Sequence, residues 1–423
     1  MSKIIVAAPP IVGELTPLLE LARRLAGRGH RITVLTGGRF RAEVESSGLA
    51  FVPLPAGADF DDRQFGGNPE RAKLAPGPEQ LNFDWVHAFV NPMPDQHAAL
   101  QVLLEQDPDQ YLICNALFLG AVPTAMGAPG RRPRRWVAVS AVPLALSSRD
   151  TTFFGPVPVG PGEDGHAANL AANAEFAGAT QPTRDRLNEL LRSLGATETF
   201  PAFVDGIITV PDAAAALTVP GFEFPRSDAP DSLHLVGNLT AQRGAAWQAP
   251  SWWPELDGSR PVVVVTQGTQ TNHDLSQLIE PALTGLADLD VTVVAAVGRE
   301  VEALSIALPE NARAAEFIPF DALLPKADLF ITNGGAGGIQ LALSVGVPVI
   351  AAGLTEDKPA NAARVAHHGL GIDMRSDSPT PEALAEATEK VLKDTGIRDN
   401  VQRLKQVYAG LDTVAEIERL TIG

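Results

Sequence analysis

The chain of 423 residues carries a formal net charge of −17, and 45% of its residues are hydrophobic. This length predicts about two domains, each with a sizeable core. Because no basic run offsets the acidic excess, we expect neither nucleic acid nor an anionic membrane as a partner. The only cysteine, Cys114, excludes an internal disulfide, and no apolar run approaches the ~20 residues of a membrane span. Since a strand begins almost at once and no signal peptide is visible, we expect a cytoplasmic protein.

Strands and helices alternate in the first half of the chain. Residues 3–8 form a continuous apolar strand, leucines at helical spacing follow over 18–25, and 31–35 form the next strand. This order predicts a parallel sheet, in which ligands bind beyond the carboxyl ends of the strands. Glu14 and Asn115 are expected at those ends. Further strands are predicted at residues 111–114, 136–140 and 214–219.

Two stretches without clear periodicity, residues 56–91 and 147–179, are predicted to be loops near the same edge of the sheet. The first is expected to contain short helices; it is aromatic and could line an apolar pocket for an acceptor. For each aromatic side chain, simple packing beneath the loop is an equally open alternative. The candidate acceptor-binding residues are Phe60, Phe65, Trp85, His87 and Phe89.

The alternation restarts in the second half, after a stretch rich in proline, glycine and tryptophan. We therefore predict an α/β fold of two tandem doubly wound Rossmann-like domains with a cleft between them. The predicted boundaries are 1–225 for the first domain, 226–250 for a linker, 251–400 for the second domain and 401–423 for a C-terminal helix. Strands of the second domain are expected at residues 262–266, 291–297, 328–332 and 347–352.

The most informative stretch is residues 317–363. Its strand ends at Thr332, the run NGGAGG follows over 333–338, and a helical pattern begins. Glycines let backbone N–H groups approach a ligand closely, and a helix N-terminus favours negative charge, so this loop could hold a phosphate or diphosphate. A tight turn packed in an α/β sheet is the alternative that such a loop leaves open.

Three ordered motifs give the loop a context: VTQGT at 265–269, TNGGAGGIQ at 332–340 and TEDKP at 355–359. They resemble the donor-binding signature of nucleotide-sugar-dependent glycosyltransferases with the GT-B fold, above all bacterial enzymes that glycosylate macrolides, other polyketides and phenolics. The resemblance spans nearly the whole chain. It implies inverting sugar transfer from a UDP- or dTDP-sugar to a hydroxyl of a small lipophilic acceptor. It also implies a C-terminal helix that returns to the first domain, no metal or other cofactor, and a monomer or homodimer.

The resemblance assigns the donor site by position. Asn333 stands where many relatives have a histidine that touches the diphosphate, and Asp357 with Lys358 stands where an Asp-Gln pair holds the sugar hydroxyls. The candidate donor-binding residues are Gln267, Gly268, Thr269, Arg299, Phe317, Ile318, Asn333, Gly335, Gly337, Gly338, Gln340, Asp357 and Lys358.

The catalytic positions depart from the family pattern. Relatives usually place a histidine in the first loop and orient it with an aspartate, and this chain has Glu14 and Asn115 there. Glu14 is therefore the candidate base. His87 or His97 as the base is an open alternative. A second open alternative is that the protein is a hydrolytic or epimerase-like homologue, or an inactive one that only binds a nucleotide sugar.

Overall fold

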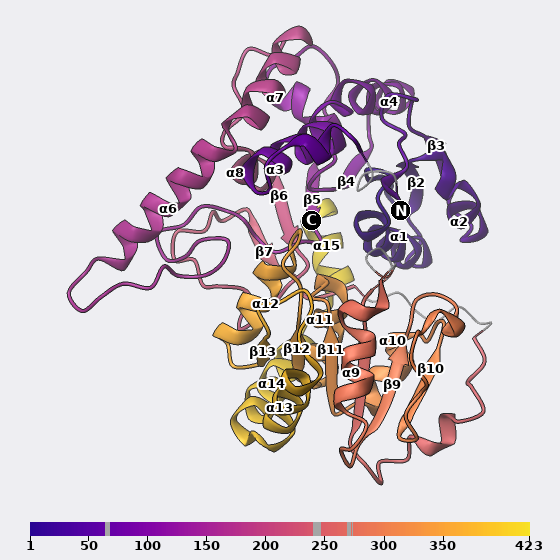
Figure 1. Ribbon diagram of the computed structural model, residues 1–423. Helices are drawn as coiled ribbons and strands as arrows, with labels where there is room; N and C mark the ends of the chain where they lie inside the picture. The colour runs from indigo at the N-terminus through magenta and orange to yellow at the C-terminus, as the bar shows by residue number, and fades with distance from the viewer. Residues whose placement is uncertain (64–67, 240–246, 269–271, 273) are drawn as a thin grey trace. The chain divides into compact units, whose positions relative to one another are not determined.

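The computed structural model describes residues 1–63, 68–239, 247–268, 272 and 274–423 (Figure 1). Its contacts divide the chain into two compact units, which we call unit 1 and unit 2. Unit 1 comprises Met1–Leu217, Pro225–Leu239 and Asp412–Gly423. Unit 2 comprises Thr218–Phe224 and Thr240–Leu411. Each is an α/β unit with one parallel sheet, as the alternating sequence pattern predicts.

The described part of unit 1 contains a sheet of seven parallel strands. The strands follow the order β3 (Ala50–Pro53), β2 (Arg31–Thr36), β1 (Lys3–Ala7), β4 (Tyr111–Asn115), β5 (Trp136–Ser140), β6 (Ala213–Ala216) and β7 (Leu233–Leu235). The order reverses at β1 and β4, so the loops that follow these two strands adjoin at the carboxyl edge.

The helices of unit 1 are α1 (Val12–Gly27), α2 (Arg41–Ser46), α3 (Pro78–Trp85), α4 (Met93–Gln106), α5 (Val122–Ala125), α6 (Gly165–Ala179), α7 (Gln181–Ser193), α8 (Phe203–Thr209) and α15 (Thr413–Ile422). A π-helical turn over Val86–Val90 extends α3. Successive residues of β1 belong to different core clusters. Ile4 and Val6 pack in one, Ile5 and Ala7 in the other, so the sheet is buried on both faces.

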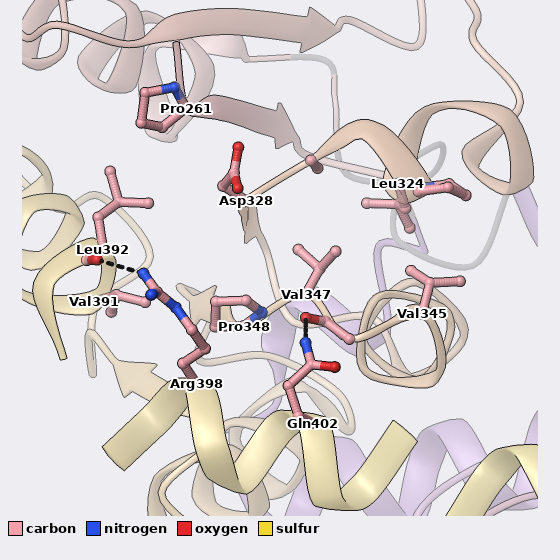
Figure 2. Close-up of a pocket in the computed structure, with 13 residues that line it drawn as sticks. Pro261, Leu324, Asp328, Val345, Val347, Pro348, Val391, Leu392, Arg398 and Gln402 are labelled. Carbon is pink, nitrogen blue, oxygen red and sulfur yellow. Dashed lines mark hydrogen bonds between the residues drawn. The ribbon is translucent and has the colours of Figure 1, made fainter. Parts of the chain in front are cut away.

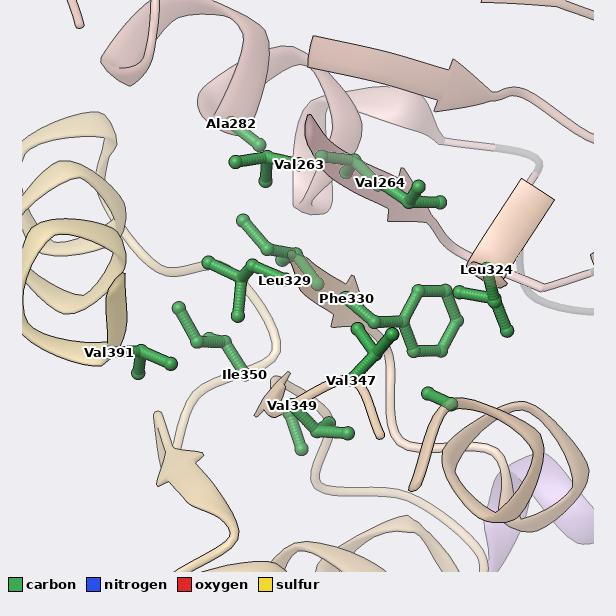
Figure 3. Close-up of a cluster of buried hydrophobic side chains, with 14 of the residues drawn as sticks. Val263, Val264, Ala282, Leu324, Leu329, Phe330, Val347, Val349, Ile350 and Val391 are labelled. Carbon is green, nitrogen blue, oxygen red and sulfur yellow. The ribbon is translucent and has the colours of Figure 1, made fainter. Parts of the chain in front are cut away.

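Unit 2 has a sheet of six parallel strands in its described residues. The strands follow the order β10 (Ala312–Ala315), β9 (Thr292–Ala296), β8 (Val262–Thr266), β11 (Leu329–Thr332), β12 (Val349–Ala351) and β13 (Gly371–Asp373). Its helices are α9 (Ile279–Gly285), α10 (Phe320–Leu323), α11 (Ala336–Val345), α12 (Lys358–His367), α13 (Pro381–Lys393) and α14 (Thr395–Ala409). Figure 3 shows part of its core, in which Phe330 of β11 lies among aliphatic side chains that include Leu324 and Val347.

Several predicted boundaries differ from the structure. The predicted loop over 147–179 contains α6, and the predicted linker over 226–250 contains the edge strand β7. The predicted single helix over 401–423 is two helices, since α14 ends at Ala409 and α15 begins at Thr413. The short strands β3, β10 and β13 were not predicted. None of the helices built from described residues is both long and apolar enough to cross a membrane.

Helix α15 packs on unit 1, as the predicted return of a C-terminal helix requires. Its apolar face, Val414, Ile417 and Leu420, joins the core cluster that contains α1. Polar contacts reinforce this packing: Arg28 Nη1 donates to Glu418 Oε2 at 2.5 Å, and His30 Nε2 lies 2.8 Å from Glu418 Oε1.

These contacts predict a pH-dependent contribution to stability. The hydrogen bond with His30, followed by that from Arg28, holds the pKa of Glu418 below its ordinary value. A carboxyl group whose pKa is lower in the folded state stabilises that state fully at pH values above its unfolded-state pKa of about 4.3. This stabilisation is lost as the pH falls through the folded-state pKa. We expect Glu418→Gln to lower the unfolding free energy by about 0.5–1 kcal/mol at pH 7.

Urea denaturation at pH 7 and below pH 4 measures this difference, which should shrink at the lower pH. Glu386→Gln on the exposed face of α13 is the control and should change little at either pH. A loss of stability for Glu418→Gln that is equal at both pH values would contradict the explanation.

Candidate functional site

The glycine loop of unit 2 joins β11 to α11. Gly334 has a left-handed backbone (φ +98), and a Cβ there would lie 3.1 Å from the Cβ of Lys358. Helix α11 begins after Gly335, and no side chain caps it. A Cβ at Gly335 or at Gly337 would meet no heavy atom within 4 Å. No side chain therefore occupies the start of α11 as a cap, and its first-turn N–H groups are left for an anion.

Gly338 has a different role in the same turn. A Cβ there would lie 3.3 Å from the ring of Phe330 on β11. Its missing side chain lets α11 pack closely on the sheet, while its backbone N–H still belongs to the first helical turn.

The loop before α12 lies against the glycine loop. Asn361 is fully buried, and its Nδ2 donates to Gly334 O and to Asp357 Oδ2, both at 3.0 Å. Burial raises the pKa of the Asp357 carboxyl above its ordinary value. Lys358 is buried and forms an ion pair with Glu356. Sequence reasoning missed Asn361, although an asparagine one turn after Asp357 is a recognisable signal.

The loops after β8 and β9 adjoin the same edge. Gly268 lies close to the side-chain amide of Asn333. A Cβ at Gly268 would be 3.5 Å from Asn333 Nδ2. Asn333 Nδ2 donates to Gln267 O at 2.5 Å. A Cβ at Gly298, the residue before the partly buried Arg299, would lie 3.0 Å from Gly268 O. The loops after β8, β9 and β12 therefore lie at the same edge as the glycine loop, which follows β11.

Two glutamines predicted to bind the donor have structural contacts. Gln267 is buried, its Nε2 donates to Asp274 O at 2.8 Å, and its Oε1 accepts from Ile279 N at 3.1 Å, which supports the start of α9. Gln340 Oε1 accepts from the Tyr408 hydroxyl at 2.5 Å, which joins α11 to α14. Both amides therefore hold the fold around the site.

The remaining donor candidates differ in exposure. Phe317 is 68% exposed just after β10, whereas the side chain of Ile318 is buried in the core of unit 2. An exposed aromatic ring beside a binding edge is available for stacking on a base. Thr269 lies outside the described residues.

Glu14 and Asn115 meet at the carboxyl edge of the unit 1 sheet. Asn115 is the last residue of β4, and its Nδ2 donates to Glu14 Oε2 at 2.5 Å. Its Oδ1 accepts from Leu117 N at 2.9 Å, which fixes the orientation of the amide. Glu14 lies in the first turn of α1 and is 8% exposed. The structure thus brings together the two predicted catalytic residues.

The two histidines considered as alternative bases have other partners. His97 is buried in α4 with Nδ1 2.9 Å from Gly120 O, and burial lowers its pKa. His87 is exposed, stacks on Phe83 with ring centroids 3.9 Å apart, and has Nδ1 2.8 Å from Phe83 O.

The predicted acceptor aromatics separate into two groups. Trp85 packs against Phe203 with ring centroids 5.0 Å apart, and Phe89 borders the same core cluster, so both contribute to the interior of unit 1. Phe60 is partly exposed in the loop after β3. Phe65 lies outside the described residues.

A separate cavity of about 300 Å³ lies at the amino ends of β8, β11 and β12 (Figure 2). Its polar groups already have partners within the fold. Arg398 donates to Leu392 O at 3.1 Å, and Gln402 donates to Gly346 O at 3.1 Å. None of the predicted site residues lines it. Across the described residues there is also no group of three or more His, Cys, Asp or Glu that could hold a metal ion.

Residues 280–421 match the family model described as Erythromycin biosynthesis protein CIII-like, C-terminal domain. UDP-glycosyltransferase 2 of Phaeomoniella chlamydospora is 36% identical over 427 residues, covering 98% of this chain and 94% of that protein. UDP-glucosyltransferase B1 of Starmerella bombicola is 33% identical over 429 residues, covering 97% and 96%.

Solved structures agree with the fold. The crystal structure of the glycotransferase of kitacinnamycin has a TM-score of 0.73 at 24% identity and covers 99% of both chains. Together with the full-length sequence relatives, the two parallel sheets and the glycine loop at the carboxyl edge of one of them confirm the predicted resemblance. The chain is a GT-B-fold glycosyltransferase and belongs to the natural-product UDP-glycosyltransferase family.

Proposed function

We propose that the protein transfers a hexosyl group from a UDP- or dTDP-sugar to a hydroxyl of a small lipophilic acceptor, with inversion at the anomeric carbon. The observation that carries this proposal is the start of α11, where no side chain caps the helix and a Cβ at Gly335 or Gly337 would meet no heavy atom within 4 Å. A diphosphate is the anion that fits such a site in a family of nucleotide-sugar enzymes.

The departing diphosphate is stabilised by unit 2. Backbone N–H groups and the dipole of α11 oppose its developing charge. Lys358, the first residue of α12 and the ion-pair partner of Glu356, adds a cation. The carboxylate of Asp357, held by Asn361, accepts hydrogen bonds from sugar hydroxyls. The exposed ring of Phe317 stacks on the base. These groups meet the charge requirements of the reaction without a metal.

The acceptor is activated by unit 1. Glu14 removes the proton of the acceptor hydroxyl as its oxygen attacks the anomeric carbon. The bond between that carbon and the diphosphate oxygen breaks, and the nucleoside diphosphate leaves with the electron pair. The transition state resembles an oxocarbenium ion, as in glycoside hydrolysis. Asn115 orients Glu14 through the hydrogen bond of 2.5 Å. Glu14 and Asn115 thus take the place of the histidine and aspartate usual in relatives.

The role of Glu14 predicts a selective loss of turnover. Glu14→Gln keeps the shape and the contact with Asn115 but cannot accept a proton, so kcat should fall at least ~100-fold while donor affinity stays nearly unchanged. Steady-state kinetics with a phenol and macrolide panel, together with calorimetry using UDP-glucose, measures both quantities.

Glu43→Gln, on the exposed face of α2, is the matched control. Wild-type turnover in Glu14→Gln would remove Glu14 from the mechanism. Nucleotide release from the wild-type protein without glycosylated product would instead favour the hydrolytic alternative, and donor binding without any turnover would favour an inactive homologue.

The donor contacts predict two separable affinity changes. Lys358→Met should weaken UDP and UDP-glucose equally, by about tenfold, because the lysine faces the diphosphate. Asp357→Asn should weaken UDP-glucose by about tenfold and leave UDP almost unchanged, because the carboxylate faces the sugar. Calorimetry with each ligand measures the four values.

Lys390→Met on the exposed face of α13 is the control for removal of a lysine charge. Equal losses for UDP and UDP-glucose in Asp357→Asn would contradict the sugar contact.

Turnover should also be unchanged by EDTA, and a loss of turnover on chelation would overturn the metal-independent reaction.

A further inference from the structure

We propose that Arg39 and Asp62 are positioning residues that clamp the turn carrying Glu14. Both act on the backbone at the start of α1, whereas Asn115 acts on the Glu14 side chain. The inference rests on the proposed role of Glu14 as the base, and all of its contacts lie within unit 1.

The start of α1 is capped by a residue from outside the helix. Ile11 occupies the N-cap position and provides no side-chain hydrogen bond to the helix. The missing acceptor comes from a residue distant in sequence, since Val12 N donates to Asp62 Oδ2 at 3.0 Å. Carboxylates are favoured at helix N-termini because the unpaired N–H groups there carry partial positive charge. Asp62 therefore caps the helix that carries Glu14, which lies two residues after Val12.

A second feature is the fork formed by Arg39. Its Nη2 donates to Pro10 O at 3.0 Å and lies 2.6 Å from Asp62 Oδ1. Its Nη1 donates to Asp61 Oδ1 at 3.1 Å. The side chain of Asp62 is only 7% exposed, and the ion pair with Arg39 offsets the cost of burying it. One rigid guanidinium thus holds the carbonyl before the helix together with the carboxylate that caps it.

A third feature is the crowding between the loops. A Cβ at Gly37 would lie 2.5 Å from Pro10 Cβ and 2.6 Å from Asp59 Oδ1, so only glycine fits. Gly38 N donates to Asp59 Oδ2 at 2.9 Å. The loops that follow β1, β2 and β3 therefore form one block. The acceptor candidate Phe60 lies between Asp59 and Asp61, so this block carries it together with Glu14.

The clamp matters because the base must be placed accurately. Glu14 N donates to Ile11 O at 3.1 Å, so Glu14 belongs to the turn that Asp62 and Arg39 fix. A movement of this turn would shift the carboxylate relative to an acceptor hydroxyl. Errors of about 1 Å in the position of a reacting group reduce rates by up to ~100-fold.

The test compares substitutions that remove different parts of the clamp. Asp62→Ala removes both the cap and the ion pair, and we expect kcat to fall about tenfold with the affinity for UDP unchanged. Asp62→Asn keeps an oxygen for Val12 N and should recover part of the lost turnover. Arg39→Lys keeps a charge but loses the fork, and should resemble Asp62→Ala.

The control for the loss of a helix cap is Asp394→Ala. Asp394 caps α14 by accepting from Ile397 N at 3.1 Å and belongs to unit 2. It should lower thermal stability to a similar extent and leave kcat unchanged. A tenfold loss of kcat in this control would show that a missing cap alone explains Asp62→Ala.

A double-mutant cycle with Glu14→Gln separates positioning from general destabilisation. If the clamp acts through Glu14, Asp62→Ala should lower kcat about tenfold in the wild-type background and hardly at all in the Glu14→Gln background. Equal losses in both backgrounds, or wild-type turnover in Asp62→Ala, would overturn the positioning role while leaving the base assignment intact. Wild-type turnover in Glu14→Gln alone would overturn the base assignment, and the positioning role with it.

Discussion

Burial of both faces of the two parallel sheets is the constraint on which the rest of the structure depends. Strands such as β1 and β8 have apolar side chains on both sides, so a charged group in their middle would be buried without a partner. The polar side chains of the candidate sites therefore lie at or beyond the ends of strands. The glycine loop after β11 and the pair of Glu14 with Asn115 both lie at carboxyl edges for this reason.

Helix α12 shows how unit 2 accommodates polar groups away from water. Asn361 binds the glycine loop and Asp357, and one turn later Arg364 donates to Glu223 Oε1 at 2.7 Å, with both side chains buried. Phe224 lies over the guanidinium, 4.6 Å from ring centroid to Cζ. Breaking such a pair on one side leaves a buried charge and typically costs about 3–5 kcal/mol. The helix that carries the predicted sugar-binding residues is thus fixed by specific partners.

The predictable parts of the molecule were those with strong local signals. Continuous apolar runs identified the central strands, and the glycine loop with its flanking motifs identified the family. Edge strands such as β7 and β10 were missed because their half-buried residues have no apolar run. Helix α6 was missed because its buried residues are Asn169 and Asn173, whose amides bind nearby carbonyls, so no hydrophobic period marks it.

For the candidate site, the sequence predicted which residues lie at the sheet edges more reliably than it predicted the partners of their side chains. Glu14 and Asn115 lie 101 residues apart in the chain, yet their hydrogen bond agrees with their shared place at the sheet edge. The amides of Gln267 and Gln340 bind the protein itself. The cap of α1 by Asp62 could not be predicted, because Asp62 lies in an aperiodic loop 50 residues from Val12. Polar pairs between residues distant in the chain produce no periodic pattern in the sequence.

The place of α15 has a consequence for how the protein is made. Its residues follow unit 2 in the chain, yet they complete the core of unit 1, most of which precedes unit 2. Until then, the surface of α1 that later contacts Val414, Ile417 and Leu420 stays uncovered while the whole of unit 2 is translated. At elongation rates of about 5–20 residues per second, this interval is on the order of ten seconds or more. Nascent chains therefore pass through a defined period in which chaperone binding competes with aggregation.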